Sequence, residues 1–248
     1  FITGASSGIG AELSAQLARR GWSVGLFARR ESELSEIAKR IEGAGGRALV
    51  LPGDVTRRED VLQAAQKVKS TWGPVDLLVA NAGIGASAKS HKAGGEPAER
   101  TIRVNVLGAM YAIDAVVESM AERKSGQIVG VSSLAGWRGL PGSAAYSASK
   151  AALTTYLETL RIDLARHGIS VTTVHPGFVK TPLTAKNKNP MPFLVELEDA
   201  ARIIADGIEA RRREVNFPLP LTLAVRLARN LPNFVYDAIM KRAGTGIG

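Results

Sequence analysis

The sequence predicts an α/β protein with a doubly wound parallel sheet and helices on both faces of that sheet. Two observations predict this class. Short apolar runs rich in Val, Leu and Ile alternate along the chain with longer segments of helical periodicity, a pattern typical of βαβ units. A glycine-rich turn also separates the first apolar run from the first helical segment. Right-handed crossovers between successive strands then favour a doubly wound sheet.

Six short segments, bounded by Gly, Pro or Asp, are predicted to be strands. They are residues 1–3, 23–27, 48–51, 75–80, 127–132 and 169–174. Five longer segments show helical periodicity: residues 9–20, 31–42, 57–72, 98–123 and 146–167. Parallel strands that are apolar throughout need cover on both faces, and the intervening helices supply that cover.

The composition predicts a single globular domain over residues 1–248. Hydrophobic residues make up 45% of the chain and charged residues 22%, and neither a linker nor a repeat interrupts the pattern. The chain contains no apolar run of about 18 residues, so no membrane span is predicted. No signal peptide is visible either, so a cytoplasmic location is expected. The chain opens at Phe1, which leaves open a preceding N-terminal segment.

The residue types present argue against cysteine chemistry and against a metal site. The chain has no cysteine, which rules out disulfides, thiolate metal sites and a cysteine nucleophile. His91, His167 and His175 lack metal-ligand spacing, so no metal is expected. His175 is interpreted as a residue of a strand end, and Trp137 either touches substrate or anchors a loop.

The net charge of +9, from 32 basic and 23 acidic residues, narrows the choice of partner. A basic chain can bind nucleic acid, anionic lipid or a phosphorylated ligand. Nucleic acid is not expected, because the chain has neither a zinc finger nor a basic-region helix. Its aromatic content of 5% is also too low for a base-stacking platform.

The turn after the first predicted strand, residues 3–10, has the sequence T-G-A-S-S-G-I-G. Its first glycine permits a tight turn, its second lets the backbone approach a pyrophosphate, and its third lets the helix pack close to the strand. The helix N-terminus then offers N–H groups and a positive dipole end to phosphates. The alternative is an ordinary glycine-rich turn. The residues expected at a dinucleotide are Gly4, Ser6, Ser7, Gly8, Ile9 and Gly10.

The second predicted strand is followed by Ala28, Arg29 and Arg30. Many dinucleotide sites carry an acidic residue here, which holds the adenosine ribose hydroxyls. An alanine instead leaves room for a 2′-phosphate, and a guanidinium can bind that phosphate through a planar set of donors. The sequence therefore predicts NADP(H) in preference to NAD(H). The alternative, a solvated charge pair, is disfavoured because cations oppose the dipole at a helix N-terminus.

Two further polar segments follow strand ends: Asp54-Val55 after the third strand, and Asn81-Ala82-Gly83 after the fourth. Asp54 could accept a hydrogen bond from the adenine amino group, and Asn81 could fix the ribose region. The alternative for each is a turn residue that bonds nearby backbone, and taken alone each is better explained in that way.

Tyr146 and Lys150 lie four residues apart at the start of a helical segment, on one helix face, and Ser133 lies at the end of the fifth predicted strand. An ammonium beside a phenol lowers the phenol pKa. Tyr146 is therefore expected to act as general acid toward a carbonyl, or general base toward an alcohol, near neutral pH. Ser133 would hydrogen-bond the substrate oxygen. For the Tyr-Lys pair alone, the alternative is a packed helix face with a snorkelling lysine.

Together these residues resemble those of the classical short-chain dehydrogenase/reductase family. The matching motifs, in the family's order, are residues 3–10, Asp54-Val55, Asn81-Ala82-Gly83, Asn105, Ser133, Tyr146, Lys150 and Pro176-Gly177. The resemblance implies a Rossmann-like sheet of about seven strands, a nicotinamide cofactor and a Ser-Tyr-Lys site. By the same resemblance Asn105 would anchor a water that relays protons through Lys150, which would also hold the cofactor ribose. Pro176, Gly177, Val179 and Thr181 would line the nicotinamide side.

The expected function is NADPH-dependent reduction of a carbonyl, reversible as an alcohol dehydrogenase, with a hydrophobic ketone or secondary alcohol as substrate. One alternative is a non-enzymatic NADP(H)-binding sensor or scaffold of the same fold. Another is an enzyme that uses the fold for epimerisation or dehydration. The presence of Asn105, Ser133, Tyr146 and Lys150 favours an active oxidoreductase.

Residues 104–120 and 151–164 are apolar or small around much of the helix circumference. Such helices need cover beyond the sheet, so a homodimer or homotetramer through them is expected. The alternative is cover by loops and the C-terminal segment of the same subunit. Residues 83–95 are predicted to be a mobile loop, and residues 178–200 a substrate loop.

Residues 217–248 are predicted to be a C-terminal helical extension that forms an amphipathic, partly exposed surface near the substrate entrance. In 221–231, one helix face carries Thr222, Arg226, Arg229 and Asn230, and apolar residues cover the rest. Pro218 and Pro220 are expected before this helix and Pro232 after it, and residues 234–241 are again apolar with a basic end. A basic amphipathic helix can contact a membrane. Packing of the apolar side on the domain or on a partner subunit is the favoured interpretation.

Overall fold

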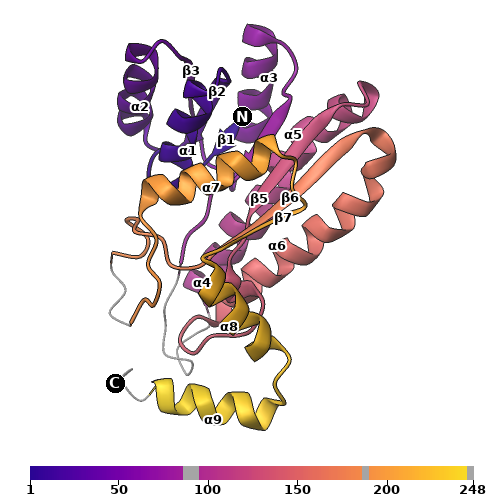
Figure 1. The fold of residues 1–248 in the computed structure, drawn as a ribbon. Coiled ribbons are helices and arrows are strands. Elements are labelled where there is room, and N and C mark those ends of the chain that lie inside the picture. The colour runs from indigo at the N-terminus through magenta and orange to yellow at the C-terminus, as the bar shows by residue number, and fades with distance from the viewer. Residues whose placement is uncertain (86–94, 186–189, 245–248) are drawn as a thin grey trace.

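The computed structural model describes residues 1–85, 95–185 and 190–244, and its strands form one parallel sheet in the order β3-β2-β1-β4-β5-β6-β7 (Figure 1). The strands are β1 (Ile2–Thr3), β2 (Ser23–Ala28), β3 (Arg47–Pro52), β4 (Leu77–Ala80), β5 (Gly126–Val131), β6 (Ile169–Pro176) and β7 (Glu214–Phe217). The helices are α1 (Gly8–Arg19), α2 (Glu31–Gly43), α3 (Arg58–Trp72), α4 (Glu96–Ile102), α5 (Gly108–Glu122), α6 (Ala144–Asp163), α7 (Leu197–Glu209), α8 (Leu219–Arg229) and α9 (Asn233–Gly244). The doubly wound α/β fold is confirmed.

Helices cover both faces of the sheet, and each face has its own apolar cluster. One cluster joins α1, α2 and α7 to the strands, and the other joins α3, α5 and α6. Successive residues of a strand point to opposite faces, so Leu26 belongs to the first cluster and Phe27 to the second. The strand order reverses between β1 and β4, and a ligand crevice is expected at that point, beyond the strand carboxyl ends.

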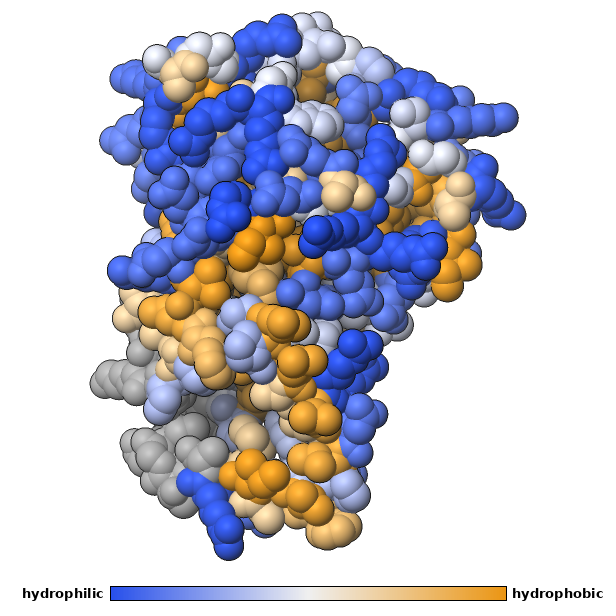
Figure 2. All heavy atoms as spheres, viewed as in Figure 1, coloured by the Kyte–Doolittle hydropathy of each residue, from blue (hydrophilic) through white to orange (hydrophobic). Residues whose placement is uncertain are grey.

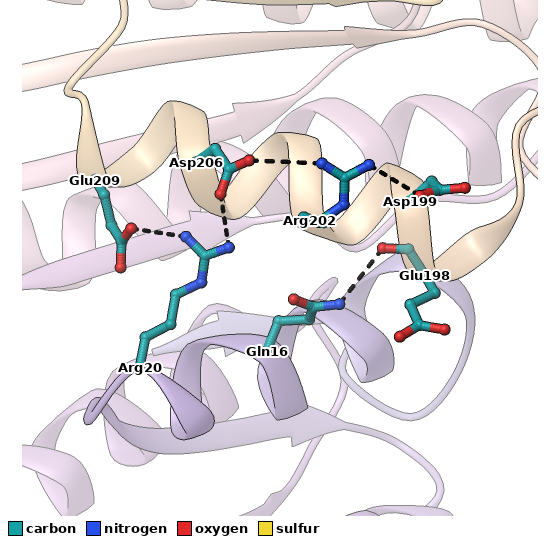
Figure 3. A network of polar contacts seen from close by, with 7 residues as sticks. All are labelled: Gln16, Arg20, Glu198, Asp199, Arg202, Asp206 and Glu209. Atoms are coloured by element: carbon teal, nitrogen blue, oxygen red, sulfur yellow. Dashed lines mark hydrogen bonds and ion pairs between the residues drawn. The ribbon is translucent and has the colours of Figure 1, made fainter.

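Helix α7 is tied to α1 by a network of ion pairs (Figure 3). The guanidinium of Arg20, the residue that caps the C-terminus of α1, contacts Asp206 Oδ1 and Glu209 Oε2 of α7, each at 2.7 Å. These carboxylates raise the pKa of Arg20. Gln16 Nε2 donates to the Glu198 carbonyl oxygen at 3.4 Å, near the start of α7. The helix that follows the predicted substrate loop is thus anchored to the helix that begins at the glycine-rich turn.

The six strands predicted individually are all present, with shifted ends. β4 begins at Leu77 rather than at residue 75, and β6 continues to Pro176 rather than ending at 174. The seventh strand, implied by the family resemblance, is β7, and α7 precedes it. The sequence pattern located neither element. β7 was missed because it has only four residues, two of them polar.

The helical segment predicted at 98–123 is interrupted by a π-helical turn at Arg103–Leu107, between α4 and α5. π-helical turns often occur at functional sites, and this one carries Asn105. By length and composition the combined stretch Glu96–Glu122 could cross a membrane. Its Ala112 and Ile113 are instead buried against the sheet, as in other core helices. The helix predicted at 146–167 ends at Asp163, and a 3₁₀ turn, Ala165–His167, follows.

The two predicted loops are only partly described. Of the loop predicted at 83–95, residues 86–94 lie outside the described part, and of the loop predicted at 178–200, residues 186–189 do. The second loop is shorter than predicted, because α7 begins at Leu197. An isolated bridge pairs Val179 with Val195 and brings the two ends of this loop together.

The C-terminal extension forms two helices, α8 and α9, which lie below the sheet in Figure 1. The predicted polar face of α8 is wrong at Thr222, which is 6% exposed and donates a hydrogen bond to the Pro218 carbonyl oxygen. Pro220 lies within the first turn of α8 rather than before it. Of the predicted apolar side, Leu223 and Leu227 are exposed and do not pack on the domain, so packing on a partner subunit stays a prediction for them.

Candidate active site

A cavity of about 340 Å³ opens along the carboxyl ends of the strands, across the point where the strand order reverses. It brings together nearly all of the residues that the sequence predicts at the site. Those that line it are Gly4, Ser6, Ser7, Gly8, Ile9, Arg29, Arg30, Asp54, Val55, Asn81, Ala82, Gly83, Ser133, Tyr146, Lys150, Pro176, Gly177, Val179 and Thr181. Gly10 and Asn105 are not among the lining residues.

The glycine-rich turn packs so closely on the end of β4 that two of its positions have no room for a side chain. Gly4 has a φ of +68°, and a Cβ there would lie 2.7 Å from the Ala82 Cα. A Cβ on Gly10 would collide with the Gly4 carbonyl oxygen and lie 2.5 Å from Asn81 Nδ2. The predicted reasons for these two glycines, a tight turn and close helix packing, therefore hold.

The side chains of Asn81 and Asp54 both bond to backbone. Asn81 Nδ2 donates to the Thr3 and Gly4 carbonyl oxygens at 3.0 and 3.3 Å, which fixes the start of the glycine-rich turn. Asp54 Oδ1 accepts from the backbone N–H and the hydroxyl of Thr56, each at 2.9 Å. Both residues line the cavity as well, so they shape its wall through the turns that they stabilise.

One end of the cavity is cationic. Arg30 Nη2 lies 2.9 Å from the hydroxyl oxygens of both Ser6 and Ser7, and Arg30 Nη1 pairs with Glu33 at 3.3 Å. Arg29 is exposed at the same end, and Ala28 closes the second strand without a carboxylate. The end nearest β2 therefore offers guanidinium and hydroxyl donors to an anion.

The other end of the cavity holds Ser133, Tyr146 and Lys150. The Ser133 hydroxyl accepts from the Ala135 N–H at 3.1 Å and donates to the Pro176 carbonyl oxygen at 3.3 Å. Lys150 is 4% exposed, and its Nζ donates to the Val131 carbonyl oxygen at 2.8 Å. The same Nζ lies 5.7 Å from the centre of the Tyr146 ring. The predicted sharing of one helix face is thus observed.

The expected lowering of the Tyr146 pKa is wrong for this structure. Burial raises the pKa of Tyr146, and a hydrogen bond with Ser133 opposes the increase only in part. Burial also lowers the pKa of Lys150 to about 8. The low-polarity surroundings destabilise both charged forms, so near neutral pH Tyr146 is a protonated phenol and Lys150 is still mostly an ammonium.

Asn105 holds in place the part of the cavity wall beside Tyr146 and Lys150. Its side chain is fully buried and makes three hydrogen bonds, with the N–H and the carbonyl oxygen of Ile84 at 2.8 and 2.9 Å and with the Ser149 hydroxyl at 2.9 Å. A Cβ on Gly83 would lie 3.4 Å from Lys150 Nζ and 3.5 Å from Asn105 Oδ1. Asn105 thus joins the π-helical turn, the end of β4 and the helix that carries Tyr146 and Lys150.

Comparison with known proteins agrees with this geometry. A family model described as short chain dehydrogenase matches residues 1–191, and the match includes every predicted catalytic residue. The chain belongs to the short-chain dehydrogenase family. It is therefore an oxidoreductase that acts on CH–OH or C=O groups with a nicotinamide cofactor, which does not support the non-enzymatic sensor.

Three similar proteins place this short-chain dehydrogenase among related sequences and structures. An uncharacterized oxidoreductase of Myxococcus xanthus (strain DK1622) is 44% identical over 98% of this chain and 96% of its own length. The structure of a 3-ketoacyl-ACP reductase from Sinorhizobium meliloti 1021 has 32% identity and a TM-score of 0.79, over 87% of this chain and 94% of that one. A short-chain dehydrogenase from Sphingobium yanoikuyae in complex with NADPH has 27% identity and a TM-score of 0.81, over 94% and 95%.

The cavity of this short-chain dehydrogenase fits a nicotinamide dinucleotide on its own geometry. Ser7 is the N-cap of α1 and makes no side-chain cap hydrogen bond, so the first N–H groups of α1 remain available to a phosphate. Gly8 lies close to Thr181, because a Cβ added to Gly8 would be in van der Waals contact with the Thr181 side chain at 3.5 Å. The lack of a side chain at Gly8 therefore leaves the space beside the helix end free for a phosphate.

A polar chain behind the site of the dehydrogenase was not anticipated. The Ser132 hydroxyl contacts the Lys150 carbonyl oxygen and the Thr154 hydroxyl, each at 2.8 Å. Thr154 in turn lies 3.2 Å from His175 Nε2, and His175 Nδ1 lies 2.8 Å from Asn216 Oδ1. His175 is thus held within β6, and the Trp137 ring packs edge-on against it at 5.2 Å. No sequence motif links these residues, because the contact with Asn216 depends on the register of β6 and β7.

Contacts of Arg138 and of Leu221, neither of which was predicted at the site, connect the C-terminal helices to the catalytic end of the cavity. Arg138, in the loop that follows Ser133, places Nη1 within 3.2 Å of the carbonyl oxygens of Ala228, Arg229 and Leu231 at the end of α8. Its guanidinium carbon also lies 4.2 Å from the centre of the Tyr236 ring on α9. Leu221 of α8 packs against Gly177, where an added Cβ would be 2.6 Å from Leu221 Cδ2.

Proposed function

We propose that this dehydrogenase is an NADPH-dependent carbonyl reductase, reversible as an alcohol dehydrogenase, for hydrophobic ketones. The observation that carries the proposal is the protonated phenol of Tyr146, beside Ser133, at the opposite end of one cavity from Arg29 and Arg30. A phenol that keeps its proton near neutral pH can donate it to a carbonyl oxygen as that oxygen gains charge.

The catalytic roles proposed for the side chains follow from their positions. When bound, the nicotinamide supplies the hydride for the carbonyl carbon. Tyr146 gives its proton to the carbonyl oxygen, and Ser133 stabilises the charge on that oxygen through a hydrogen bond. Lys150 holds the cofactor ribose with its ammonium, and Asn105 positions the Ile84 segment and the helix that carries Lys150. The relay water proposed at Asn105 would have to bind beside this closed set of side-chain hydrogen bonds.

The preference for NADP(H) over NAD(H) is proposed from charge. Arg29 and Arg30 supply cationic donors where the adenosine 2′-phosphate would lie, and Ala28 brings no carboxylate to repel it. The similar enzyme from Sphingobium yanoikuyae was solved with NADPH, which supports the same choice. The remaining residues proposed to bind the cofactor are Gly4, Ser6, Ser7, Gly8, Ile9, Gly10, Asp54, Val55, Asn81, Ala82, Gly83, Pro176, Gly177, Val179 and Thr181.

A hydrophobic substrate is proposed from the side chains around the catalytic end. Val104, Val131, Val179 and Leu183 line the cavity there, and Leu221 packs behind Gly177. The similar structure from Sinorhizobium meliloti is of a 3-ketoacyl-ACP reductase, so a ketone within an acyl chain is a reasonable first substrate. A homodimer or homotetramer through α5 and α6 is also proposed, because small and apolar residues cover much of the circumference of both helices, which then need cover beyond the sheet.

The test is a Tyr146→Phe variant assayed for NADPH oxidation with a panel of ketones that includes a 3-ketoacyl thioester. Removal of the proton donor should lower turnover about 10²- to 10⁴-fold and leave NADPH affinity nearly unchanged. Tyr156→Phe on the same helix, which does not line the cavity, is the matched control. Full turnover by Tyr146→Phe would refute the proposal, and product formed without stoichiometric NADPH oxidation would indicate epimerisation or dehydration instead.

A further inference from the structure

The two C-terminal helices carry a concentration of exposed large apolar side chains. On α8, Leu219 is 66%, Leu223 50% and Leu227 73% exposed, and on α9, Phe234 is 77% and Ile239 50% exposed. Figure 2 shows apolar side chains gathered over this lower part of the molecule. Scattered exposed apolar residues are ordinary, but a contiguous patch usually marks an interaction site.

The apolar side chains share one face on each helix. Leu219, Leu223 and Leu227 recur every four residues and therefore form a stripe along α8, while Thr222 is turned inward. On α9 a shallow hollow is lined by Phe234, Val235, Ala238, Ile239 and Arg242. The opposite side of α9 faces the domain, where the Tyr236 hydroxyl donates to the Gly139 carbonyl oxygen at 2.6 Å.

The charges beside this patch are mainly cationic. Arg226 and Arg229 lie on α8, and Lys241 and Arg242 lie on α9, against one acidic residue, Asp237, in the two helices. Contact between two copies of this surface across a two-fold axis would bring like charges together. Anionic lipid headgroups would instead complement the cations, while the acyl region accepts the leucines and Phe234.

The patch is attached to the domain next to the site. Arg138 binds the carbonyl oxygens at the end of α8 and stacks on Tyr236 of α9. Leu221, on the inner side of α8, packs on Gly177 of the cavity wall. A surface that rests on a bilayer through α8 and α9 would therefore bring the cavity close to the membrane interface.

We propose that α8 and α9 form a docking surface for an anionic lipid bilayer, on which they lie in the plane of the interface with Leu223, Leu227 and Phe234 inserted. Lipid binding does not depend on the reduction chemistry, so this proposal can fail while the proposed function holds, and the reverse. If both hold, a hydrophobic ketone can reach the cavity from the lipid phase.

The test is flotation of the full chain with vesicles of phosphatidylcholine containing phosphatidylglycerol. We expect binding to these vesicles, and each cation near the surface should strengthen it about fivefold relative to phosphatidylcholine alone. Leu223→Glu with Leu227→Glu should weaken binding roughly tenfold or more, and Arg226→Gln with Lys241→Gln should remove most of the preference for anionic lipid. Gln63→Glu with Gln66→Glu, which adds two carboxylates at exposed positions of α3, is the matched control for charge and should bind normally.

Two further measurements complete the test: the mass of the protein in solution, which gives its oligomeric state, and its turnover of a short ketone. All variants change exposed side chains, so turnover of a water-soluble ketone should stay at the wild-type value and show that the fold is intact. Absence of vesicle binding, or equal binding by the leucine variant, would overturn the proposal. It would also be overturned if the leucine variant lost an oligomer rather than lipid binding, because the occupant would then be a second copy of the chain.

Discussion

The glycine-rich turn and the C-terminal helices are attached to the same cavity in different ways. At the turn, backbone atoms of residues 4, 10 and 82 lie so close together that added side-chain carbons would collide. At the other side, α8 and α9 are held chiefly by the side chains of Arg138 and Tyr236. The first attachment depends on backbone shape, and the second on contacts between residues about 90 positions apart in sequence.

The difference has a consequence for tolerance to change. A backbone contact cannot relax around an added methyl group without moving a strand, whereas a side-chain contact can be lost without disturbing the sheet. The cofactor end should therefore respond to small substitutions with large effects. The C-terminal helices should loosen while the chemistry continues.

The largest expected effect is that of Gly10→Ala. The new Cβ would collide with the Gly4 carbonyl oxygen and crowd Asn81 Nδ2, so we expect a loss of roughly 3 kcal/mol of unfolding free energy or more, together with loss of cofactor binding. Urea unfolding and NADPH titration measure both. Gly43→Ala at the end of α2 meets no atom within 4 Å and should be neutral or slightly stabilising. Equal behaviour of the two variants would contradict the close-packing argument.

Next in size is the double change Ala28→Asp with Arg29→Ile. It adds a carboxylate and removes a cation where the 2′-phosphate is proposed to lie, so NADPH binding should weaken by roughly 1.5–3 kcal/mol while NADH binding changes little. The ratio of the two dissociation constants is the measurement. Arg19→Ile, on α1 away from the cavity, should leave that ratio unchanged. An unchanged ratio in the double variant would place the phosphate elsewhere.

Lys150 should give the cofactor-free protein a distinctive pH dependence. Its pKa is about 8 in the folded chain, against an ordinary value of 10.5. Between these values the unfolded chain binds more protons, so unfolding free energy should rise with pH there, by about 2 kcal/mol from pH ~7.5 to pH ~9.5. Below pH ~7 both states are almost fully protonated and the cost of burying the charge is constant. In urea unfolding, the Lys150→Met variant should lack this increase. Parallel plots of unfolding free energy against pH for the wild type and the variant would contradict the prediction.

The smallest effect expected on chemistry is that of Arg138→Leu. It removes the hydrogen bonds to the carbonyl oxygens of α8 and the contact with Tyr236, so local opening of α8 and α9 should become easier by roughly 1 kcal/mol. Amide hydrogen exchange should accelerate in these helices and not in β5 or β6, with turnover of a short ketone preserved. Arg166→Leu, which removes a hydrogen bond from Nε to the adjacent His167 ring, is the control. If amide exchange in α8 and α9 were equally fast in Arg138→Leu and in the wild type, other contacts would hold these helices.

The same contrast explains what the sequence could predict. Gly4, Gly10, Tyr146 and Lys150 belong to short motifs whose spacing fixes their relative positions, so cavity and proton-transfer residues could be located in advance. The raised pKa of Tyr146 could not be, because it depends on burial created by the whole fold. Partial exposure of the C-terminal segment was expected, but the sequence could not say that the leucine stripe of α8 lies outside, because an amphipathic pattern does not show which face meets the protein.

Arg138 recognises α8 through main-chain carbonyl oxygens, those of Ala228, Arg229 and Leu231. Every residue type presents such an oxygen, so the identities of these three residues are not constrained by the contact itself. This contact would therefore survive substitution of the three residues, whereas the packing of Leu221 on Gly177 depends on its side chain. Substitutions on the outer side of α8 can therefore change the surface that it presents while the contact with Arg138 remains.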